Sequence, residues 1–287
     1  MNIPQEWRII DFITWAENCF KDKEFKNSRS EIEWIIRSVL DIKRIDIYLN
    51  FDKSLSIKEI KTLKSFVNRR LKNEPLQYIT NTSEFYGREY FVDNNVLIPR
   101  PETETLIDLA LQNLKGINCP KILDIGTGSG CLAITMAVEI SNSRVTGIDI
   151  SKDAINIANI NKTKYKLKNI LFRKIDILKQ IINNQFDLII SNPPYIATNE
   201  LATVMKDVKN YEPLIALTDN ADGLTFYKKF SSIAKHILKD NGRMLLEVGS
   251  GTQPKKVQDI FTKEGFINAR LFKDLNGDDR AILTKKL

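Results

Sequence analysis

Histidine and cysteine are nearly absent from this sequence, and their scarcity excludes several classes of site. His236 is the only histidine among the 287 residues. A metal centre built from several imidazoles is therefore excluded, and a Ser-His-Asp triad is disfavoured. The three cysteines, Cys19, Cys119 and Cys131, show no CxxC spacing. Their positions argue against a disulfide framework and against a zinc site, so we expect no metal and a cytosolic location.

Long apolar runs are also absent. No run approaches the roughly 18 residues of a membrane helix, and the charges within the first 20 positions are unlike a signal peptide. With 43% hydrophobic and 28% charged residues, the chain can bury the core of one large or two modest domains. The net charge of +7 is a weak sign of an acidic partner. We interpret the densest basic tract, 162–174, as a solvated helix end rather than a nucleic-acid surface.

Residues 1–74 are predicted to form a small helical domain. Ser28 and Ser56 each precede a glutamate by three positions, which is the spacing of a capping box. Apolar residues recur at helical spacing after each box, as Ile32, Ile35, Ile36 and Val39 and as Ile57, Ile60, Leu63, Val67 and Leu71. Because no catalytic constellation occurs here, we expect this domain to serve recognition or support.

Residues 75–100 are predicted to form a linker with a β-hairpin. The stretch 84–98 is rich in aromatic and β-branched residues and contains turn residues at Gly87 and 93–95. Arg100, Glu102 and Glu104 follow, around a proline that suits the first turn of a helix. These three charges fit equally well a role in lining a site and a favourable interaction with a helix start.

A glycine-rich loop near the start of the remaining domain, 101–287, follows a predicted strand at 121–125. The loop consists of Gly126, Thr127, Gly128, Ser129 and Gly130. Its spacing is GxGxG rather than the GxGxxG of dinucleotide-binding proteins. Glycines allow a tight turn and a close approach of the backbone to a ligand.

A second predicted strand, 145–149, ends in Asp149, 19 residues after the loop. A carboxylate in that place can accept both hydroxyl groups of a ribose. The loop and the acid together favour a nucleoside with a charged tail, such as S-adenosylmethionine, over a pyrophosphate cofactor. The structural alternative is that Asp149 only caps a helix.

Further strands alternate with helical stretches along the rest of the chain. We expect strands at 170–173, 186–190 and 243–248, and a closing hairpin of 270–273 with 281–284. The pattern predicts an α/β fold with a doubly wound, mostly parallel sheet. Ile177, shortly after the strand at 170–173, is placed to flank an adenine ring. The insertion 196–225 is either a lid or a surface loop.

The strand at 186–190 leads into Asn192, Pro193, Pro194 and Tyr195. Two prolines stiffen this NPPY loop, and open α/β sheets bind ligands at the carboxyl ends of their strands. The Asn192 side-chain oxygen and the Pro193 carbonyl could accept the two hydrogens of an NH2 group and aim its nitrogen at an electrophile. Tyr195 could pack on the flat face of that group. The alternative is an ordinary Pro-Pro turn.

On these motifs the chain resembles the HemK/PrmC family, the release factor glutamine N5-methyltransferases, over nearly its whole length. The resemblance rests on PLQYIT (75–80), EFYG (84–87), VLIPRPETE (96–104), ILDIGTGSGC (122–131), FDLIISNPPYI (186–196), YEPLIAL (211–217) and DGL (222–224). It implies a seven-stranded, Rossmann-like class I methyltransferase sheet with a small helical domain at its amino-terminal side.

The resemblance also implies the reaction and the site. The cofactor would be S-adenosylmethionine, released as S-adenosylhomocysteine, and the substrate the GGQ glutamine of class I peptide chain release factors. The cofactor would contact Gly126, Thr127, Gly128, Ser129, Gly130, Asp149, Ile177 and Asn192. The glutamine would contact Asn192, Pro193, Pro194 and Tyr195, of which Asn192, Pro193 and Tyr195 would be catalytic. We expect a cytoplasmic monomer that binds neither membrane nor nucleic acid directly.

Two other functions fit parts of the sequence. A DNA or RNA amino-methyltransferase would use the same NPPY box and would place the basic tract on phosphates. A non-catalytic scaffold would keep only the cofactor pocket, which the intact NPPY box disfavours. For the glutamine enzyme we expect in-line methyl transfer in which the protein supplies orientation, and loss of the proton after methylation, since no strong base is evident.

Overall fold

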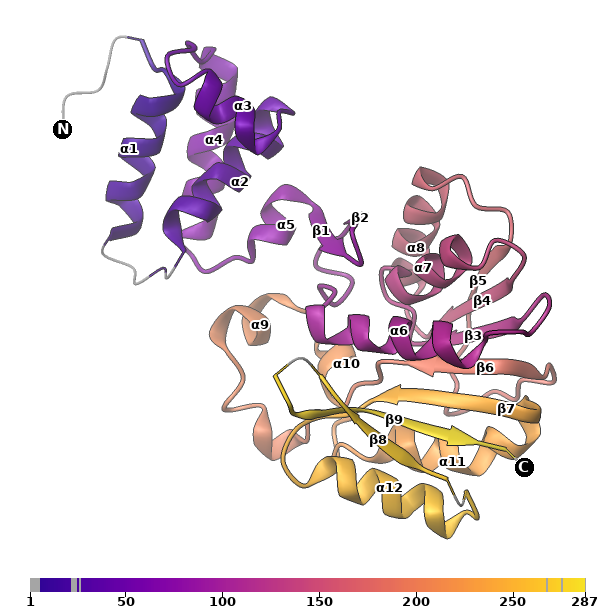
Figure 1. The fold of residues 1–287 in the computed structure, drawn as a ribbon. Coiled ribbons are helices and arrows are strands. Elements are labelled where there is room, and N and C mark those ends of the chain that lie inside the picture. Colours follow the sequence, from indigo (N-terminus) through magenta and orange to yellow (C-terminus); the bar gives the residue numbers. More distant parts are fainter. Residues whose placement is uncertain (1–5, 22–24, 26, 267, 275, 287) are drawn as a thin grey trace. The chain divides into compact units, whose positions relative to one another are not determined.

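The computed structural model describes residues 6–21, 25, 27–266, 268–274 and 276–286 (Figure 1). The chain divides into two compact units: residues 1–81 with 206–211, and residues 82–205 with 212–287. The first is helical, and the second contains the large sheet. No helix of the described ranges is long and apolar enough to cross a membrane.

The helical unit contains α1 (Ile9–Phe20), α2 (Ser28–Leu40), α3 (Arg44–Leu49), α4 (Ile57–Arg70), α5 (Leu76–Thr80) and α9 (Lys206–Tyr211). Its core confirms most of both predicted stripes, because Ile32, Ile35, Ile36, Leu63 and Val67 are buried. The expectation for Ile57 is wrong, since its side chain is 87% exposed. Ile57 is the first residue of α4, and helical side chains lean toward the amino terminus, so Ile57 projects past the helix end.

The two predicted capping boxes have different outcomes. The Ser56 box is confirmed: Ser56 Oγ accepts from the Glu59 backbone N–H at 3.3 Å, and Glu59 Oε2 accepts from the Ser56 N–H at 2.7 Å. The Ser28 box is wrong, because α2 begins at Ser28 itself and has no side-chain cap. The carboxylate of Glu31 instead accepts two hydrogen bonds from the Arg70 guanidinium, at 2.6 and 3.0 Å, a stronger charge-assisted pair than a cap could offer.

The second unit begins with the predicted hairpin, β1 (Thr82–Phe85) and β2 (Arg88–Phe91), which pairs as a separate two-stranded sheet. The main sheet has the order β5-β4-β3-β6-β7-β9-β8. Its parallel strands are β3 (Lys121–Ile125), β4 (Arg144–Asp149), β5 (Ile170–Lys174), β6 (Phe186–Ser191) and β7 (Leu238–Glu247). The antiparallel strands β8 (Arg270–Lys273) and β9 (Asp279–Lys285) form the closing hairpin. The predicted seven-stranded, mostly parallel sheet is thereby confirmed.

Helices cover both faces of this sheet (Figure 1). On one face α6 (Glu104–Asn113), α7 (Cys131–Glu139) and α8 (Lys152–Lys164) bury their apolar sides against Ile122, Leu188 and Leu245. On the other, α11 (Thr225–Ile237) and α12 (Gln253–Lys263) pack against Leu123, Ile189 and Leu246. The doubly wound arrangement follows, since alternate strand residues face opposite sides.

The pairing register brings the ends of four strands to one edge. Ile125 at the end of β3 pairs with Ile148 of β4 and with Ser191 of β6, and Ser191 pairs with Leu246 of β7. The residues that follow these positions therefore meet at one edge, where open α/β sheets bind ligands. The 3-10 turns η2 (Pro101–Thr103) and η3 (Thr198–Glu200) and the short helix α10 (Leu214–Leu217) also belong to this unit.

Ser56→Ala should destabilise the helical unit by about 0.5–2 kcal/mol, the cost of losing a helix cap. Ser28→Ala is the matched control and should change the free energy of unfolding by less than about 0.5 kcal/mol, because no cap is lost. All three tryptophans, Trp7, Trp15 and Trp34, lie in the helical unit, so urea unfolding followed by tryptophan fluorescence reports on that unit. Equal effects of the two substitutions would contradict the cap assignment.

Candidate active site

The glycine loop and Asp149 form one wall of a cavity. Gly128 has a φ of +52°, a conformation that glycine adopts without strain, and its N–H donates to Asp149 Oδ2 at 3.0 Å. The other carboxylate oxygen accepts from the Ser151 N–H at 2.9 Å. Burial raises the pKa of Asp149, while the backbone donors oppose that rise. The carboxylate is thus fixed by two backbone amides at the rim of the loop, and each of its oxygens keeps lone pairs for a ligand.

Not every residue of the loop reaches the cavity. Gly126 and Gly128 line it, whereas Thr127, Ser129 and Gly130 are not among the lining residues. The Thr127 hydroxyl donates to Asp124 Oδ2 at 2.6 Å, and burial raises the pKa of Asp124 to about 7. A Cβ on Gly130 would lie 3.0 Å from the Phe172 ring, so this glycine is needed for close packing. Thr127 and Gly130 therefore fix the loop against the core rather than facing a ligand.

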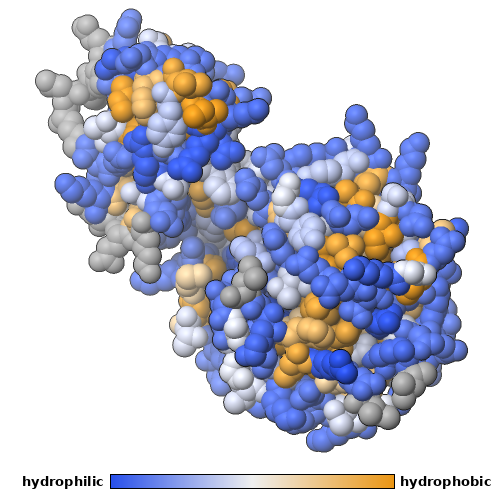
Figure 2. Space-filling model, viewed as in Figure 1, coloured by the Kyte–Doolittle hydropathy of each residue, from blue (hydrophilic) through white to orange (hydrophobic). Residues whose placement is uncertain are grey.

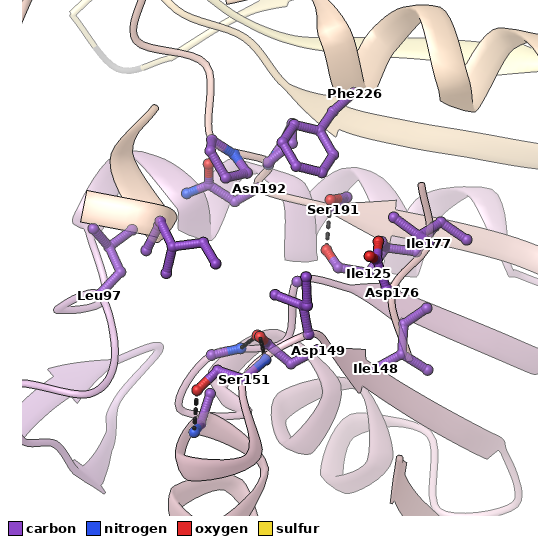
Figure 3. Close-up of a pocket in the computed structure, with 18 of the residues that line it drawn as sticks. Leu97, Ile125, Ile148, Asp149, Ser151, Asp176, Ile177, Ser191, Asn192 and Phe226 are labelled. Carbon is purple, nitrogen blue, oxygen red and sulfur yellow. Dashed lines mark hydrogen bonds between the residues drawn. The ribbon is translucent and has the colours of Figure 1, made fainter. Parts of the chain in front are cut away.

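The cavity has a volume of about 240 Å³ and a largely apolar lining. Ile150 and Ile177 line it from the ends of β4 and β5, and Phe226 and Phe230 from α11. Figure 3 shows Asn192 and Phe226 on one side and Asp149 and Ser151 on the other. A flat apolar group fits between such walls, with polar contacts available at the Asp149 side. A nucleoside has these two parts, a flat base and a polar ribose.

The NPPY loop forms the opposite wall. Asn192, Pro193 and Pro194 line the cavity, but Tyr195 does not. The Tyr195 hydroxyl instead donates to Glu247 Oε1 at 3.2 Å, and its ring packs partly buried against the core under α11 and α12. Burial raises the pKa of Tyr195 far above its usual value, so the phenol remains a hydrogen-bond donor. Tyr195 is positioned to hold the loop in place rather than to touch a group in the cavity.

A buried chain of hydrogen bonds continues from Asn192. Its side-chain Nδ2 donates to Thr103 Oγ1 at 3.2 Å, and the Thr103 hydroxyl donates to Glu247 Oε2 at 2.6 Å. Glu247 is 1% exposed, and this burial raises its pKa to about 7. Within the described part of the chain, no group donates to Asn192 Oδ1. That oxygen is therefore available as an acceptor at the cavity wall.

The predicted charges Arg100, Glu102 and Glu104 do not line the cavity. Arg100 donates to Glu212 Oε1 at 2.5 Å, and Glu212 Oε2 accepts from the Ile98 N–H at 3.2 Å. Glu104 accepts from the Tyr86 N–H at 2.7 Å, and neither it nor Arg100 or Glu102 is among the lining residues. The Arg100–Glu212 pair joins the 95–100 segment to the start of α10.

These two joined segments form a third wall of the cavity. Val96 and Leu97 contribute from one segment, and Ile215 and Ala216 from α10. The insertion 196–225 is thus divided between the two units, since α9 belongs to the helical one. Spacing alone did not reveal α10 as a wall.

Thr103 and Glu247 are the functional candidates that the sequence analysis missed. Glu247 ends a strand after the apolar residues Met244 to Leu246, just as Asp149 ends β4. The rule that identified Asp149 could therefore have identified Glu247. Thr103 lies between Glu102 and Glu104, and no pattern in the sequence indicates that its hydroxyl is buried.

Family models match both units. The one described as "PrmC N-terminal domain" matches residues 11–80. The one described as "Methyltransferase domain" matches residues 119–280. A model for protein-L-isoaspartate(D-aspartate) O-methyltransferase matches residues 55–181 and so overlaps both.

Curated relatives align over nearly the full length. The release factor glutamine methyltransferase of Geobacter sulfurreducens is 36% identical over 279 residues, which is 97% of this chain and 97% of that protein. That of Thermodesulfovibrio yellowstonii is 38% identical over 265 residues, covering 92% and 94%. A solved T. thermophilus 16S rRNA methyltransferase in complex with AdoMet and guanosine has a TM-score of 0.52 at 17% identity, over 72% of this chain and 50% of that one. The last likeness shows the fold alone.

Asp149→Ala should weaken binding of S-adenosylmethionine by about 1.5–3 kcal/mol, roughly 10- to 150-fold, because a hydrogen bond to a charged group is lost. Asp153→Ala is the control: it removes the same charge from an exposed position of α8 and should leave affinity unchanged. Isothermal titration calorimetry measures both. An unchanged affinity in folded Asp149→Ala would remove Asp149 from the site.

Proposed function

Since the chain belongs to the family of release factor glutamine methyltransferases, we propose that it methylates the side-chain amide nitrogen, N5, of the GGQ glutamine of class I peptide chain release factors. The methyl donor is S-adenosylmethionine, and the products are N5-methylglutamine and S-adenosylhomocysteine. The observation that carries the proposal is the acceptor oxygen of Asn192, to which no described group donates, at the wall of a largely apolar cavity that Asp149 also lines.

The lining residues fit S-adenosylmethionine. Asp149 would accept the ribose hydroxyls, Ile150 and Ile177 would flank the adenine, and the open face of Gly128 leaves room for the charged tail. The cofactor supplies an electrophilic methyl group on its sulfonium, and the chain supplies binding and orientation.

Orientation is what a glutamine amide requires, because its nitrogen lone pair is delocalised into the carbonyl. Asn192 Oδ1 and the Pro193 carbonyl would accept the two amide hydrogens and hold the nitrogen toward the methyl group. Glu247 already accepts from the hydroxyls of Thr103 and Tyr195, so it is not placed as a base at the amide. The proton would leave after methylation.

We assign recognition of the release factor to residues 1–74, a linking role to residues 75–100 and catalysis to residues 101–287. The match of the amino-terminal family model supports the first assignment. Ile45 and Leu49 on α3 are 57% and 73% exposed, and Figure 2 shows apolar surface over this part of the helical unit. The protein would act in the cytoplasm as a monomer on a protein substrate, without direct nucleic-acid binding.

Asn192→Ala should lower transfer of labelled methyl to a release factor by at least about a hundredfold, since misplaced reacting groups alone can cost that much, while cofactor affinity is largely kept. Asn192→Asp should also be impaired mainly in turnover, because it loses the NH2 donor to Thr103 and adds a charge. Asn142→Ala, at an exposed turn, is the control. Transfer to DNA or RNA with none to the release factor would refute the proposed function and favour a nucleic-acid amino-methyltransferase.

Leu49→Asp should raise the KM for the release factor by roughly fivefold or more, which corresponds to about 1 kcal/mol of lost contact. Affinity for the cofactor should not change, because Leu49 belongs to the helical unit. Leu171→Asp, at an exposed leucine of the other unit, serves as the matched control. An unchanged KM in Leu49→Asp would exclude α3 from the recognition surface.

A further inference from the structure

Glu247 is a buried acid that the proposed chemistry does not use directly. It ends β7 at 1% exposure, and both of its carboxylate oxygens accept hydrogen bonds from hydroxyl groups. Thr103 Oγ1 donates to Oε2 at 2.6 Å, and the Tyr195 hydroxyl donates to Oε1 at 3.2 Å. A buried acid costs stability unless its oxygens are hydrogen-bonded, and here both oxygens accept, from Tyr195 of the NPPY loop and from Thr103, which is hydrogen-bonded to Asn192 of that loop.

The donor in the Thr103–Glu247 hydrogen bond determines the donor in the hydrogen bond between Thr103 and Asn192. An ionised carboxylate only accepts, so the single hydroxyl hydrogen of Thr103 is committed to Glu247. The Thr103 oxygen can then only accept, and the group of Asn192 that faces it must be the NH2 donor, as the 3.2 Å bond shows. The two ends of a carboxamide have nearly the same shape, so hydrogen bonding rather than packing decides which end points where.

We propose that Glu247, acting through Thr103, is a positioning residue that turns the Asn192 carboxamide oxygen into the cavity as the acceptor for the substrate NH2 group. This inference rests on the proposed function of Asn192. Neither Glu247 nor Thr103 touches the cavity, so both act through Asn192.

Protonation of Glu247 would remove this control. A neutral acid has a hydrogen of its own, which it can donate to Thr103, and Thr103 is then free to donate to the carboxamide oxygen instead of accepting from its NH2. The Asn192 carboxamide would then rotate by half a turn, so that its NH2 group instead of its oxygen would face the NH2 group of the substrate. Burial raises the pKa of Glu247 to about 7, so the competent ionised form is lost as the pH falls through that value.

Several charged and titratable groups face Glu247 and influence whether its carboxyl group is ionised or neutral. Arg280 on β9 favours the ionised form, and Glu102 on η2 opposes it. Tyr195 donates to the side chain, and Tyr227 on α11 donates to the Glu247 backbone oxygen at 2.8 Å. Burial raises the pKa of both tyrosines, so they stay neutral donors over the range in which Glu247 titrates. Of these neighbours, none replaces Thr103 as the link to Asn192.

The kinetic test compares Thr103→Val, Thr103→Ser and Glu247→Gln with the parent on a release factor, from pH 6 to 8. The parent rate should fall on the acid side with an apparent pKa near 7. Thr103→Val, which keeps the shape and loses the hydroxyl, should lower kcat by roughly 10- to 100-fold with an unchanged KM for the cofactor. Thr103→Ser should restore most of kcat. Glu247→Gln should lower kcat and abolish the acid limb.

His236→Gln is the control for the pH profile, because it removes the single imidazole of the sequence from an exposed position of α11, away from the lining of the cavity. It should keep the full acid limb and the parent rate. A parent-like kcat in Thr103→Val, failure of Thr103→Ser to restore it in a folded protein, or an unchanged acid limb in Glu247→Gln would each overturn the proposal.

A second readout needs no acceptor and so separates this inference from the proposed function. With ¹⁵N-labelled asparagine, the Asn192 side-chain NH2 signal is the one that Asn192→Asp removes. It should shift with pH around an apparent pKa of about 7 in the parent, and stop doing so in Glu247→Gln and Thr103→Val. If the parent methylates no release factor, the proposed function fails. An Asn192 signal indifferent to pH and to both substitutions overturns the positioning role, whatever the acceptor.

Discussion

The site depends on the in-register parallel pairing of four neighbouring strands. Because β4, β3, β6 and β7 run side by side in one direction, their carboxyl ends meet at one edge of the sheet. Asp149, the glycine loop, Asn192 and Glu247 each follow or end one of these strands. A shift of one strand by a residue would turn alternate side chains to the opposite face and separate the carboxylate from the amide. The apolar layers on both faces exclude such a shift, since each strand buries residues on both sides.

At this edge of the sheet, the proposed reaction depends on the orientation of the hydrogen-bonding groups around the substrate amide. In the proposed reaction, acceptors hold the two amide hydrogens and leave the nitrogen facing the methyl group. The chain of bonds from Tyr195 through Glu247 and Thr103 to Asn192 gives each polar group one defined role. Such an arrangement is costly because it buries a carboxyl group, and a fully satisfied network is the form in which that cost is acceptable.

Much of this could be predicted from the sequence because the signals are local. Five parallel strands read as short, largely apolar runs, the glycine loop and NPPY box have fixed spacing, and the Ser56 box is formed as expected. The errors have two causes, a distant partner in one case and the exact start of a helix in the other. Glu31 pairs with Arg70 instead of forming a capping box with Ser28. Ile57 is the first residue of α4, and its side chain is exposed beyond the packed part of that helix. The bond between Thr103 and Glu247 joins residues 144 positions apart, so no local pattern could indicate it.

The central claim is that the amide held at Asn192 is that of one particular glutamine. Tandem mass spectrometry of a class I release factor, incubated with the enzyme and S-adenosylmethionine and then digested, measures this directly. The account predicts a single added methyl group on the side chain of the GGQ glutamine, and none on a release factor in which that glutamine is alanine. A methyl group on another residue, or on both forms of the release factor alike, would contradict it.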